Sequence, residues 1–256
     1  MNKENQAKII ELVKQAKPLI LQEMAHEKVT EKGVADYVTN VDVAVQNYLK
    51  EALGKEFPDI ALIAEEKENL GLNSRKSYWI LDPIDGTTNL IRDYHLSAVS
   101  LGLYENGKIT FGVVYNPFTE ELFYGAKGEG AYLNGTPIHV SDQQEFKDAV
   151  VSFGSSPYEK NRAKELFPIF YNIFMNCADF RRTGSAALDL CYVACGRQHA
   201  YLEQNLKPWD YSGATVILRE AGGTITDWEN KEPPYLENSD ILACVPQFRD
   251  ILQRLI

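Results

Sequence analysis

Two aspartates lie three residues apart in the segment Trp-Ile-Leu-Asp-Pro-Ile-Asp-Gly-Thr-Thr-Asn-Leu, residues 79–90. The apolar residues 79–81 have the length and composition of a buried strand, which leads directly into Asp82 and Asp85. Two carboxylates at this spacing repel each other unless a cation lies between them, and Mg²⁺ prefers oxygen ligands of this kind. The segment therefore indicates ligands for a hard divalent cation at the end of a strand.

A tight turn follows the two aspartates. Gly86, Thr87 and Thr88 offer three consecutive backbone N–H groups, and Asn89 is expected to open a helix. Amides arranged in this way can bind an anion. The pattern indicates metal ligands beside a phosphate-binding turn, although an ordinary turn whose Asp and Thr cap a helix would use the same residue types.

Residues 82–89 resemble the signature of the inositol monophosphatase family, within the larger group of Mg²⁺-dependent, lithium-sensitive sugar and nucleotide phosphatases. Three more blocks agree with the family in order. Residues 36–42, Asp-x-Val-Thr-x-x-Asp, resemble its first block, and Glu65 follows a short apolar strand as a family metal ligand does. Trp-Asp at 209–210, followed by Glu-Ala-Gly-Gly, resembles its C-terminal signature. The family commonly has Gly directly before the acids at 65–66, where this chain has Ala64.

The acids outside residues 82–89 also have plain structural interpretations. On local pattern alone, Asp42 would cap a helix expected at 43–53, and Glu65 would lie in a solvated loop. Asp210 would be favoured at a helix start by the helix dipole. The resemblance gives these residues their functional interpretation.

The resemblance implies an α+β, mixed fold: a layered α-β-α-β-α sandwich of the inositol monophosphatase / fructose-1,6-bisphosphatase (sugar phosphatase) type. Residues 1–141 are expected to form an N-terminal α+β domain with an antiparallel sheet and most metal ligands. Residues 142–256 are expected to form a C-terminal α/β domain that completes the metal and substrate site, since the polar stretch 141–148 suits a boundary.

A role for each acid is implied by the same resemblance. One Mg²⁺ ion would be bound by Glu65, Asp82 and the backbone carbonyl of Ile84. A second would be bound by Asp82, Asp85 and Asp210, so that Asp82 bridges the two ions. Glu65 could hold a third, weaker ion, which makes two or three ions in all.

Catalytic and substrate contacts are implied in the same way. Asp42 and Thr87, with Glu65 at the metal, would orient and deprotonate the attacking water. Phosphate oxygens would meet the backbone amides of Gly86 and Thr87. The sugar or cyclitol ring would lie toward residues of the second half of the chain: Gly184, Ser185, Ala186 and Glu203, with Ser155 a weaker candidate.

The resemblance implies Mg²⁺-dependent hydrolysis of a phosphate monoester, in which a metal-activated water attacks the phosphate. Inositol-1-monophosphatase is the activity expected first. Alternatives on the same site are NADP(H) phosphatase, fructose-1,6-bisphosphatase and 3′-phosphoadenosine 5′-phosphate phosphatase activities. A non-enzyme alternative is a silent metabolite-binding regulator on the same scaffold. A protein-nucleophile route lacks support, because the sequence has no Gly-x-Ser-x-Gly elbow and its four histidines form no motif.

The composition limits partners and location. The 256 residues include 36 acidic and 26 basic side chains, a net charge of -10, which disfavours nucleic acid as a partner. No secretory signal and no membrane span are expected. Four cysteines fit no zinc or disulfide framework and are expected to be buried free thiols, as in a cytoplasmic protein. The expected partner is a small phosphorylated metabolite, and the resemblance implies a homodimer.

Hydrophobic periodicity predicts the scaffold. Residues 4–27 are expected to form one helix kinked at Pro18, and residues 32–40 a loop near the site. A polar link at 69–78 and an antiparallel meander over 96–140 come next. Strands and helices alternate from residue 149 onward, which favours a mixed sheet with helices on both faces.

One motif resembles a nucleotide-binding loop and is rejected. Gly102 and Gly107-Lys108 have the spacing of a P-loop, but Ile109 stands at the Ser/Thr position. The surrounding pattern is typical of strand, turn and strand, whereas a P-loop leads from a strand into a helix. A hairpin is therefore predicted here.

Overall fold

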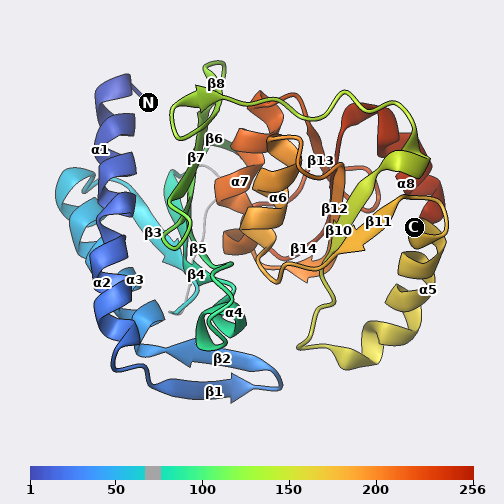
Figure 1. The fold of residues 1–256 in the computed structure, drawn as a ribbon. Helices are drawn as coiled ribbons and strands as arrows, with labels where there is room; N and C mark the ends of the chain where they lie inside the picture. Colours follow the sequence, from blue (N-terminus) through green and yellow to red (C-terminus); the bar gives the residue numbers. More distant parts are fainter. Residues whose placement is uncertain (67–75) are drawn as a thin grey trace.

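The computed structural model describes residues 1–66 and 76–256, and the polar link expected at 69–78 falls mostly outside them. Five layers follow one another across the molecule (Figure 1). The first is made of α1 (Lys3–Lys14), α2 (Ala16–Met24) and α3 (Asn40–Glu56). The second is a seven-stranded sheet, the third α6 (Ala186–Ala194) and α7 (Pro208–Glu220), and the fourth a five-stranded sheet. The fifth contains α5 (Ala163–Phe174) and α8 (Arg249–Leu255), which confirms the predicted layered fold.

The first sheet follows the chain, strand by strand. Its strands, in spatial order, are β3 (Ala61–Ala64), β4 (Tyr78–Asp85), β5 (Ala98–Glu105), β6 (Lys108–Asn116), β7 (Glu121–Ala126), β8 (Gly130–Leu133) and β9 (Thr136–Pro137). Strands β3 and β4 are parallel, and every later pair is antiparallel. The motif at 102–108 lies on the β5–β6 hairpin, as predicted.

The second sheet is mixed. Its strands, in spatial order, are β11 (Asp179–Arg181), β10 (Val150–Phe153), β12 (Ala200–Leu206), β14 (Ser239–Cys244) and β13 (Thr224–Asp227). Strand β10 is parallel to both of its neighbours, whereas β14 is antiparallel to β12 and β13. Helices on both sides of this sheet agree with the alternation read from residue 149 onward (Figure 1).

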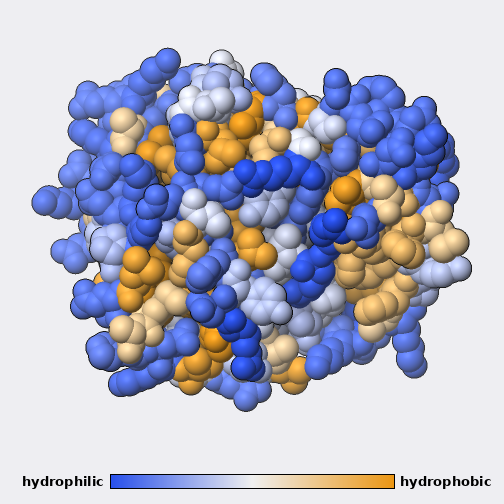
Figure 2. Space-filling model, viewed as in Figure 1, coloured by the Kyte–Doolittle hydropathy of each residue, from blue (hydrophilic) through white to orange (hydrophobic). Residues whose placement is uncertain are grey.

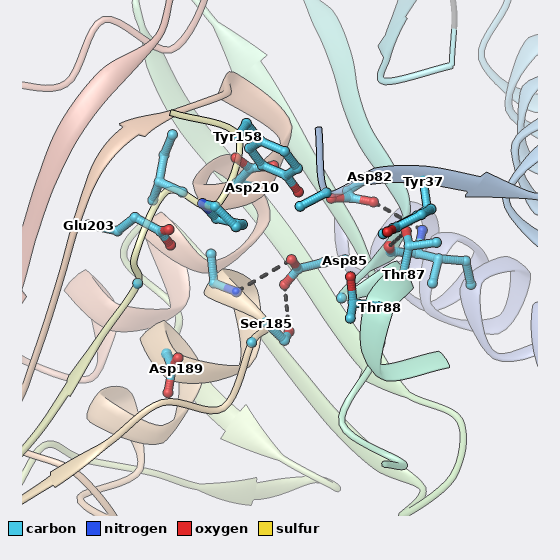
Figure 3. Close-up of a pocket in the computed structure, with 18 of the residues that line it drawn as sticks. Tyr37, Asp82, Asp85, Thr87, Thr88, Tyr158, Ser185, Asp189, Glu203 and Asp210 are labelled. Atoms are coloured by element: carbon cyan, nitrogen blue, oxygen red, sulfur yellow. Dashed lines mark hydrogen bonds between the residues drawn. The ribbon is translucent and has the colours of Figure 1, made fainter. Parts of the chain in front are cut away.

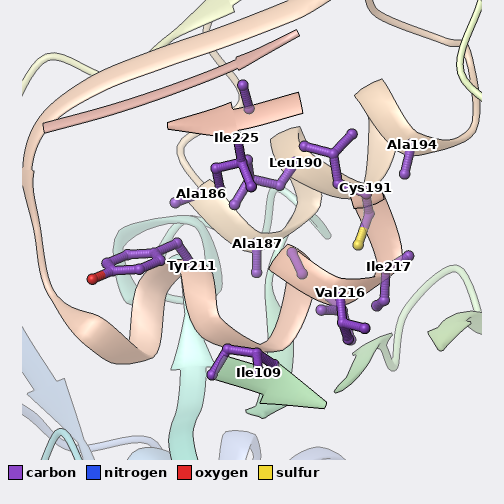
Figure 4. Close-up of a cluster of buried hydrophobic side chains, with 14 of the residues drawn as sticks. Ile109, Ala186, Ala187, Leu190, Cys191, Ala194, Tyr211, Val216, Ile217 and Ile225 are labelled. Carbon is purple, nitrogen blue, oxygen red and sulfur yellow. The ribbon is translucent and has the colours of Figure 1, made fainter. Parts of the chain in front are cut away.

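The middle helices join the two sheets through one core. Side chains of α6 and α7 pack between Ile109 of the first sheet and Ile225 of the second (Figure 4). Helix α7 approaches the first sheet so closely that a Cβ on Gly112 would lie 2.0 Å from the carbonyl oxygen of Gly213. The strands of the first sheet come before residue 141 and those of the second sheet come after it. The division into two domains stays a prediction, because this core contains residues from both sides of that position.

The N-terminal region differs from expectation in two places. Residues 4–27 form two helices divided at Gln15, because the ring of Pro18 cannot sit beside the carbonyl four residues earlier in a continuous helix. Residues 32–40 are not a loop: β1 (Val29–Gly33) and β2 (Asp36–Thr39) form a two-stranded hairpin. Every residue of β1 is exposed, so no hydrophobic alternation marks it.

Two other expectations concern the cysteines and membrane spans. The four cysteines are free thiols; Cys191 and Cys244 are buried, whereas Cys177 and Cys195 are half-buried. Within the described ranges 1–66 and 76–256, none of the helices has the length and apolar character that a membrane span requires.

Candidate active site

A cavity of about 430 Å³ lies between the elements of the first and second sheets, and the predicted site residues gather around it (Figure 3). Its lining includes eleven of them: Glu65, Asp82, Ile84, Asp85, Gly86, Thr87, Gly184, Ser185, Ala186, Glu203 and Asp210. Asp42 lies behind this wall in contact with Thr87. Ser155 does not line the cavity in the described structure, but its hydroxyl lies 3.5 Å from the Arg182 guanidinium, which does.

Strand β4 carries the first two aspartates to the cavity. All eight of its residues are buried. Strict alternation would place residues three apart on opposite faces of a strand, but the pairing with β5 shifts between Asp82 and Asp85. Pro83 lies at this irregularity, and the Ile84 N–H donates to Asp82 Oδ1 at 3.0 Å. The shift lets both carboxylates face one cavity.

The turn after β4 requires a glycine. Gly86 has φ +91° and precedes the short helix α4 (Thr87–Ile91). A Cβ at this position would also lie 3.0 Å from the carbonyl oxygen of Leu96. Only glycine adopts this conformation without strain, so the turn can present its N–H groups at the cavity.

Asp42 is the third residue of α3 and also contacts the turn; the helix begins three residues before the expected 43–53, and its N-cap is Thr39 rather than Asp42. Its Oδ2 accepts hydrogen bonds from the N–H and hydroxyl of Thr39 at 2.8 and 2.6 Å, which completes a capping box at the start of α3. Its Oδ1 accepts from the Thr87 hydroxyl at 3.0 Å. Burial raises the pKa of Asp42, and the Thr39 bonds oppose this. One carboxylate oxygen thus serves the helix start, and the other faces the turn after β4.

Asp85 is seated against the first turn of α6. The Ser185 hydroxyl donates to its carboxylate at 2.5 Å (Figure 3). The Ala187 N–H donates to the same oxygen at 2.7 Å. The Ala186 N–H lies 3.3 Å from the other carboxylate oxygen. Burial raises the pKa of Asp85 to about 6 against these hydrogen bonds.

The remaining acids crowd the same region. Burial raises the pKa of Glu65 to about 7, although the Lys32 ammonium, 3.2 Å away, opposes this. Burial holds the pKa of Asp210 well above its usual range, and the charges of Asp85 and Glu65 add to this. Asp82 behaves in the same way, with burial as the largest cause, followed by the charge of Glu65. The negative charges of neighbouring acids thus help to raise the pKa values of Glu65, Asp82 and Asp210.

The donor set suits a hard divalent cation, because it consists of buried oxygen ligands that repel one another. Within residues 1–66 and 76–256, no group of three or more Asp, Glu, His or Cys side chains already converges as a metal cluster. The acids are turned instead to protein partners: Asp85 to Ser185, Asp210 to the Lys207 N–H at 2.7 Å, and Glu65 to Lys32.

Glu203 of β12 forms part of the cavity wall on the side of the second sheet. Its Oε1 accepts from the Ser156 N–H at 3.0 Å, and its Oε2 from the Tyr201 hydroxyl at 2.6 Å. A Cβ on Gly154 would lie 1.8 Å from this carboxylate. The position of Glu203 therefore depends on the absence of a side chain at residue 154.

Sequence reasoning missed several residues that line the cavity: Tyr37, Arg92, Tyr158, Arg182 and Asp189. Asp189 is 2% exposed and accepts hydrogen bonds from the Thr183 hydroxyl at 2.7 Å and the Gln198 amide at 3.2 Å. It follows the predicted substrate turn by only a few residues, but an acid in an apolar helix start looks like an ordinary cap. Tyr37 lies inside the first sequence block, where it could have been noticed.

Comparison with known proteins gives the same family along the whole chain. The sequence matches the model of the inositol monophosphatase family over residues 1–254. It is 38% identical to the Nus factor SuhB of Pasteurella multocida, over 88% of this chain and 85% of that protein. The extragenic suppressor protein suhB of Bartonella henselae superposes with a TM-score of 0.92 at 32% identity, covering 99% of this chain and 98% of that one. An inositol monophosphatase from Anabaena superposes with a TM-score of 0.86 at 33% identity, covering 97% and 93%.

Other similar structures contain ions and phosphate compounds. An IMPase/NADP phosphatase, 25% identical with a TM-score of 0.91 over 99% of this chain and 95% of that one, was solved with Mg²⁺ and phosphate. A structure of an IMPase/NADP phosphatase with NADP and Ca²⁺ is 26% identical, with a TM-score of 0.91 and the same coverage. A Staphylococcal inositol monophosphatase-1, 25% identical with a TM-score of 0.91 over 99% and 94% of the chains, was solved as an inhibitory complex with LiCl.

Proposed function

The chain belongs to the inositol monophosphatase family, and on that basis we propose that it is a Mg²⁺-dependent phosphate monoester hydrolase that acts on inositol 1-phosphate. One observation carries the proposal. Four acids from three separate segments, Glu65, Asp82, Asp85 and Asp210, line one cavity of about 430 Å³ beside a glycine turn. A binding protein has no need for so many buried like charges, which destabilise the fold unless cations join them.

The cations would be held by the carboxylates of Glu65, Asp82, Asp85 and Asp210 and by the carbonyl oxygen of Ile84. Two or three bound Mg²⁺ ions supply charge neutralisation of the phosphate, a lowered pKa for water and stabilisation of the leaving oxygen. Asp82, 2% exposed and central in the cavity, is the residue proposed to serve two ions.

Asp42 and Thr87 are the proposed route for the proton of the attacking water. The Thr87 hydroxyl lies 3.0 Å from Asp42 Oδ1 and 3.1 Å from the Ile84 carbonyl oxygen. When it donates to Asp42, its oxygen can accept a proton from water. As Thr87 Oγ1 accepts that proton, its own proton passes to Asp42. Asp42 is fully buried and held by Thr39, so it keeps its orientation throughout.

The substrate would lie between the two halves of the chain. The N–H groups of Gly86 and Thr87 would bind phosphate oxygens, because the turn presents them at the cavity. The cyclitol ring would face residues of the other half of the chain: Gly184, Ser185, Ala186 and Glu203, with Ser155 farther off beside Arg182. Carboxylate and backbone groups suit the hydroxyls of a polyol.

The test is a panel of phosphate esters assayed for phosphate release with the purified protein. Inositol 1-phosphate should be hydrolysed fastest, ahead of NADP, fructose 1,6-bisphosphate and 3′-phosphoadenosine 5′-phosphate, and only when Mg²⁺ is present. Asp210→Asn should lower the rate at least a hundredfold without loss of the fold. Release that persists in excess chelator, or in Asp210→Asn, would refute the metal mechanism. A faster rate on NADP would replace the proposed substrate, an alternative that the similarity to an IMPase/NADP phosphatase favours.

Lithium inhibition is part of the proposal. Li⁺ resembles Mg²⁺ in size but carries half its charge, so it would occupy a ligand set of this kind without supplying the same chemistry. The similar Staphylococcal enzyme solved as an inhibitory complex with LiCl supports this. Phosphate release should fall as LiCl is added and should be unaffected by the same concentration of NaCl.

A non-enzymatic role is the second candidate. The curated relatives are named Nus factors, and one of them is 38% identical over 88% of this chain. Calorimetry would separate the two roles: binding of inositol 1-phosphate without any phosphate release would favour a metabolite-binding regulator. Residence in the cytoplasm remains a prediction from the four free thiols.

We also propose that the protein is a homodimer that associates through α5. The inner face of this helix is buried, yet its outer face exposes Phe167, Tyr171 and Phe174 at 57%, 63% and 49%. Hydrophobic residues gather over this helix on the surface (Figure 2). A helix that is apolar on both sides is typical of a buried element, so a second copy is the proposed cover. Light scattering should give twice the chain mass of 28.9 kDa for the wild type and the single mass for Phe167→Glu.

A further inference from the structure

Gln46 pairs with the backbone of the residue that follows Glu65. Its side-chain Nε2 donates to the Glu66 carbonyl at 3.0 Å, and its Oε1 accepts from the Glu66 N–H at 3.0 Å. Gln46 is 6% exposed. One side-chain amide thus satisfies both backbone groups of one residue, as a neighbouring strand would do.

The place of this pair in the sheet explains why such a support is needed. Strand β3 ends at Ala64 and lies at the edge of the seven-stranded sheet, next to β4 alone. Glu65 and Glu66 come after Ala64, the last residue of β3 that pairs with β4, and in the described ranges 1–66 and 76–256 neither belongs to a strand. Unsupported edge backbone is mobile, and a carboxylate carried on it would be poorly placed. The two bonds from Gln46 supply the missing support.

The helix that carries Gln46 also carries Asp42. The two residues stand four apart on α3 and therefore share one face of the helix. Asp42 accepts from the Thr87 hydroxyl, while Gln46 binds the Glu66 backbone. Helix α3 thus contacts both the turn after β4 and the turn after β3.

From this geometry we infer that Gln46 is a positioning residue that fixes Glu65 for cation binding. The inference rests on the proposed function. Residues that orient metal ligands typically change metal affinity 10- to 100-fold when they are replaced.

The test compares Gln46→Met, which keeps the length of the side chain and removes both hydrogen-bonding groups, with the wild-type protein. Calorimetric titration with Mg²⁺ should show affinity weakened roughly tenfold or more. Hydrogen exchange at the Glu66 amide should be faster in the variant, because its acceptor is gone. If Gln46→Met fails to fold, Gln46→Asn tests the same point, since its amide is one methylene too short to reach both groups.

Asn116→Leu is the matched control. Asn116 is a fully buried amide that holds another turn, through bonds to the His95 carbonyl and the Phe118 and Thr119 N–H groups. The Asn116→Leu variant should lose stability, as Gln46→Met does, but keep the wild-type Mg²⁺ affinity. Equal Mg²⁺ affinity in Gln46→Met and the wild type would overturn the inference while leaving the proposed function intact. A wild type that binds no Mg²⁺ and releases no phosphate would overturn the proposed function itself.

Discussion

Ser185 and Asp85 stand 100 residues apart in the chain, and the Ser185 hydroxyl donates a hydrogen bond to the Asp85 carboxylate at 2.5 Å. Ser185 is also the N-cap of α6, since its oxygen accepts from the Leu188 N–H at 3.3 Å. One hydroxyl therefore caps the start of a helix and also binds an acid carried by the other half of the chain. This contact ties strand β4 to the second half of the chain at the cavity.

Ser185→Ala should lower the free energy of unfolding by about 1–2 kcal/mol, because a helix loses its cap and a buried carboxylate loses a donor. Urea denaturation of the metal-free protein measures this. Asn2→Ala is the control, since Asn2 caps α1 through the Asn5 N–H in an exposed position. A smaller loss is expected there. If the two variants lose the same free energy, the bond to Asp85 contributes nothing to stability.

Asp82→Asn should separate stability from function. Asp82 is 2% exposed among other carboxylates, so removing its charge relieves repulsion, and the metal-free variant should melt a few degrees above the wild type. Mg²⁺ should raise the melting temperature of the wild type and leave that of the variant nearly unchanged. Thermal scans with and without Mg²⁺ measure both effects. The exposed Asp59, replaced in the same way, should behave as the wild type; an equal response to Mg²⁺ in Asp82→Asn would contradict a metal role.

The acids of the site could be predicted from the sequence because their residue types are rare in the interior and their spacing carries chemistry. Asp82 and Asp85 follow an apolar run directly, so local pattern places them at a strand end. Asp42, Glu65 and Asp210 needed the family resemblance, since each also suits a cap or a loop. In the structure Asp42 completes the capping box of α3, whose N-cap is Thr39, and its other carboxylate oxygen contacts Thr87.

Gln46 and Asp189 could not be predicted in the same way, because their hydrogen-bond partners follow no helix or strand periodicity. The partner of Gln46 is a backbone twenty residues away, and no side-chain type marks that backbone. Asp189 is defined by Thr183 on one side and Gln198 on the other. The hairpin strand β1 is exposed along its length and lacks the alternation that reveals a strand.

Asp189 should make stability depend on pH. Burial raises its pKa to about 7 in the folded protein, against an ordinary value of 3.8. The folded state therefore holds a proton that the unfolded chain releases, and this stabilisation is complete below about pH 4 and is lost as the pH rises through about 7. Asn cannot ionise, so only the wild type should lose this stabilisation. The free energy of unfolding of Asp189→Asn minus that of the wild type should therefore increase from pH 5 to pH 8. The improvement should be a few kcal/mol, at about 1.4 kcal/mol for each pH unit between the two pKa values.

Urea denaturation at pH 5 and pH 8 in chelator measures this difference, and other titrating groups cancel because both proteins contain them. Asn has nearly the shape of Asp, and its one oxygen can still accept the bond from either Thr183 or Gln198. A difference between variant and wild type that does not change with pH would show that Asp189 is ionised in the folded protein throughout this range.

Gly154→Ala should damage substrate binding and leave the cations in place. The added Cβ would lie 1.8 Å from the Glu203 carboxylate, so that carboxylate must leave its bonds to the Ser156 N–H and the Tyr201 hydroxyl. Because Glu203 is proposed to bind the ring of the substrate, the KM for inositol 1-phosphate should rise about tenfold or more, the cost of one hydrogen bond to a charged group. Calorimetric Mg²⁺ affinity should stay at the wild-type value, since Glu203 is not among the proposed ligands.

Gly54→Ala is the control: nothing lies within 4 Å of its added Cβ in α3, so it should keep the wild-type KM and gain up to about 1 kcal/mol of stability. An unchanged KM in Gly154→Ala would remove Glu203 from the substrate site, and a weakened Mg²⁺ affinity would place it with the metal ligands instead.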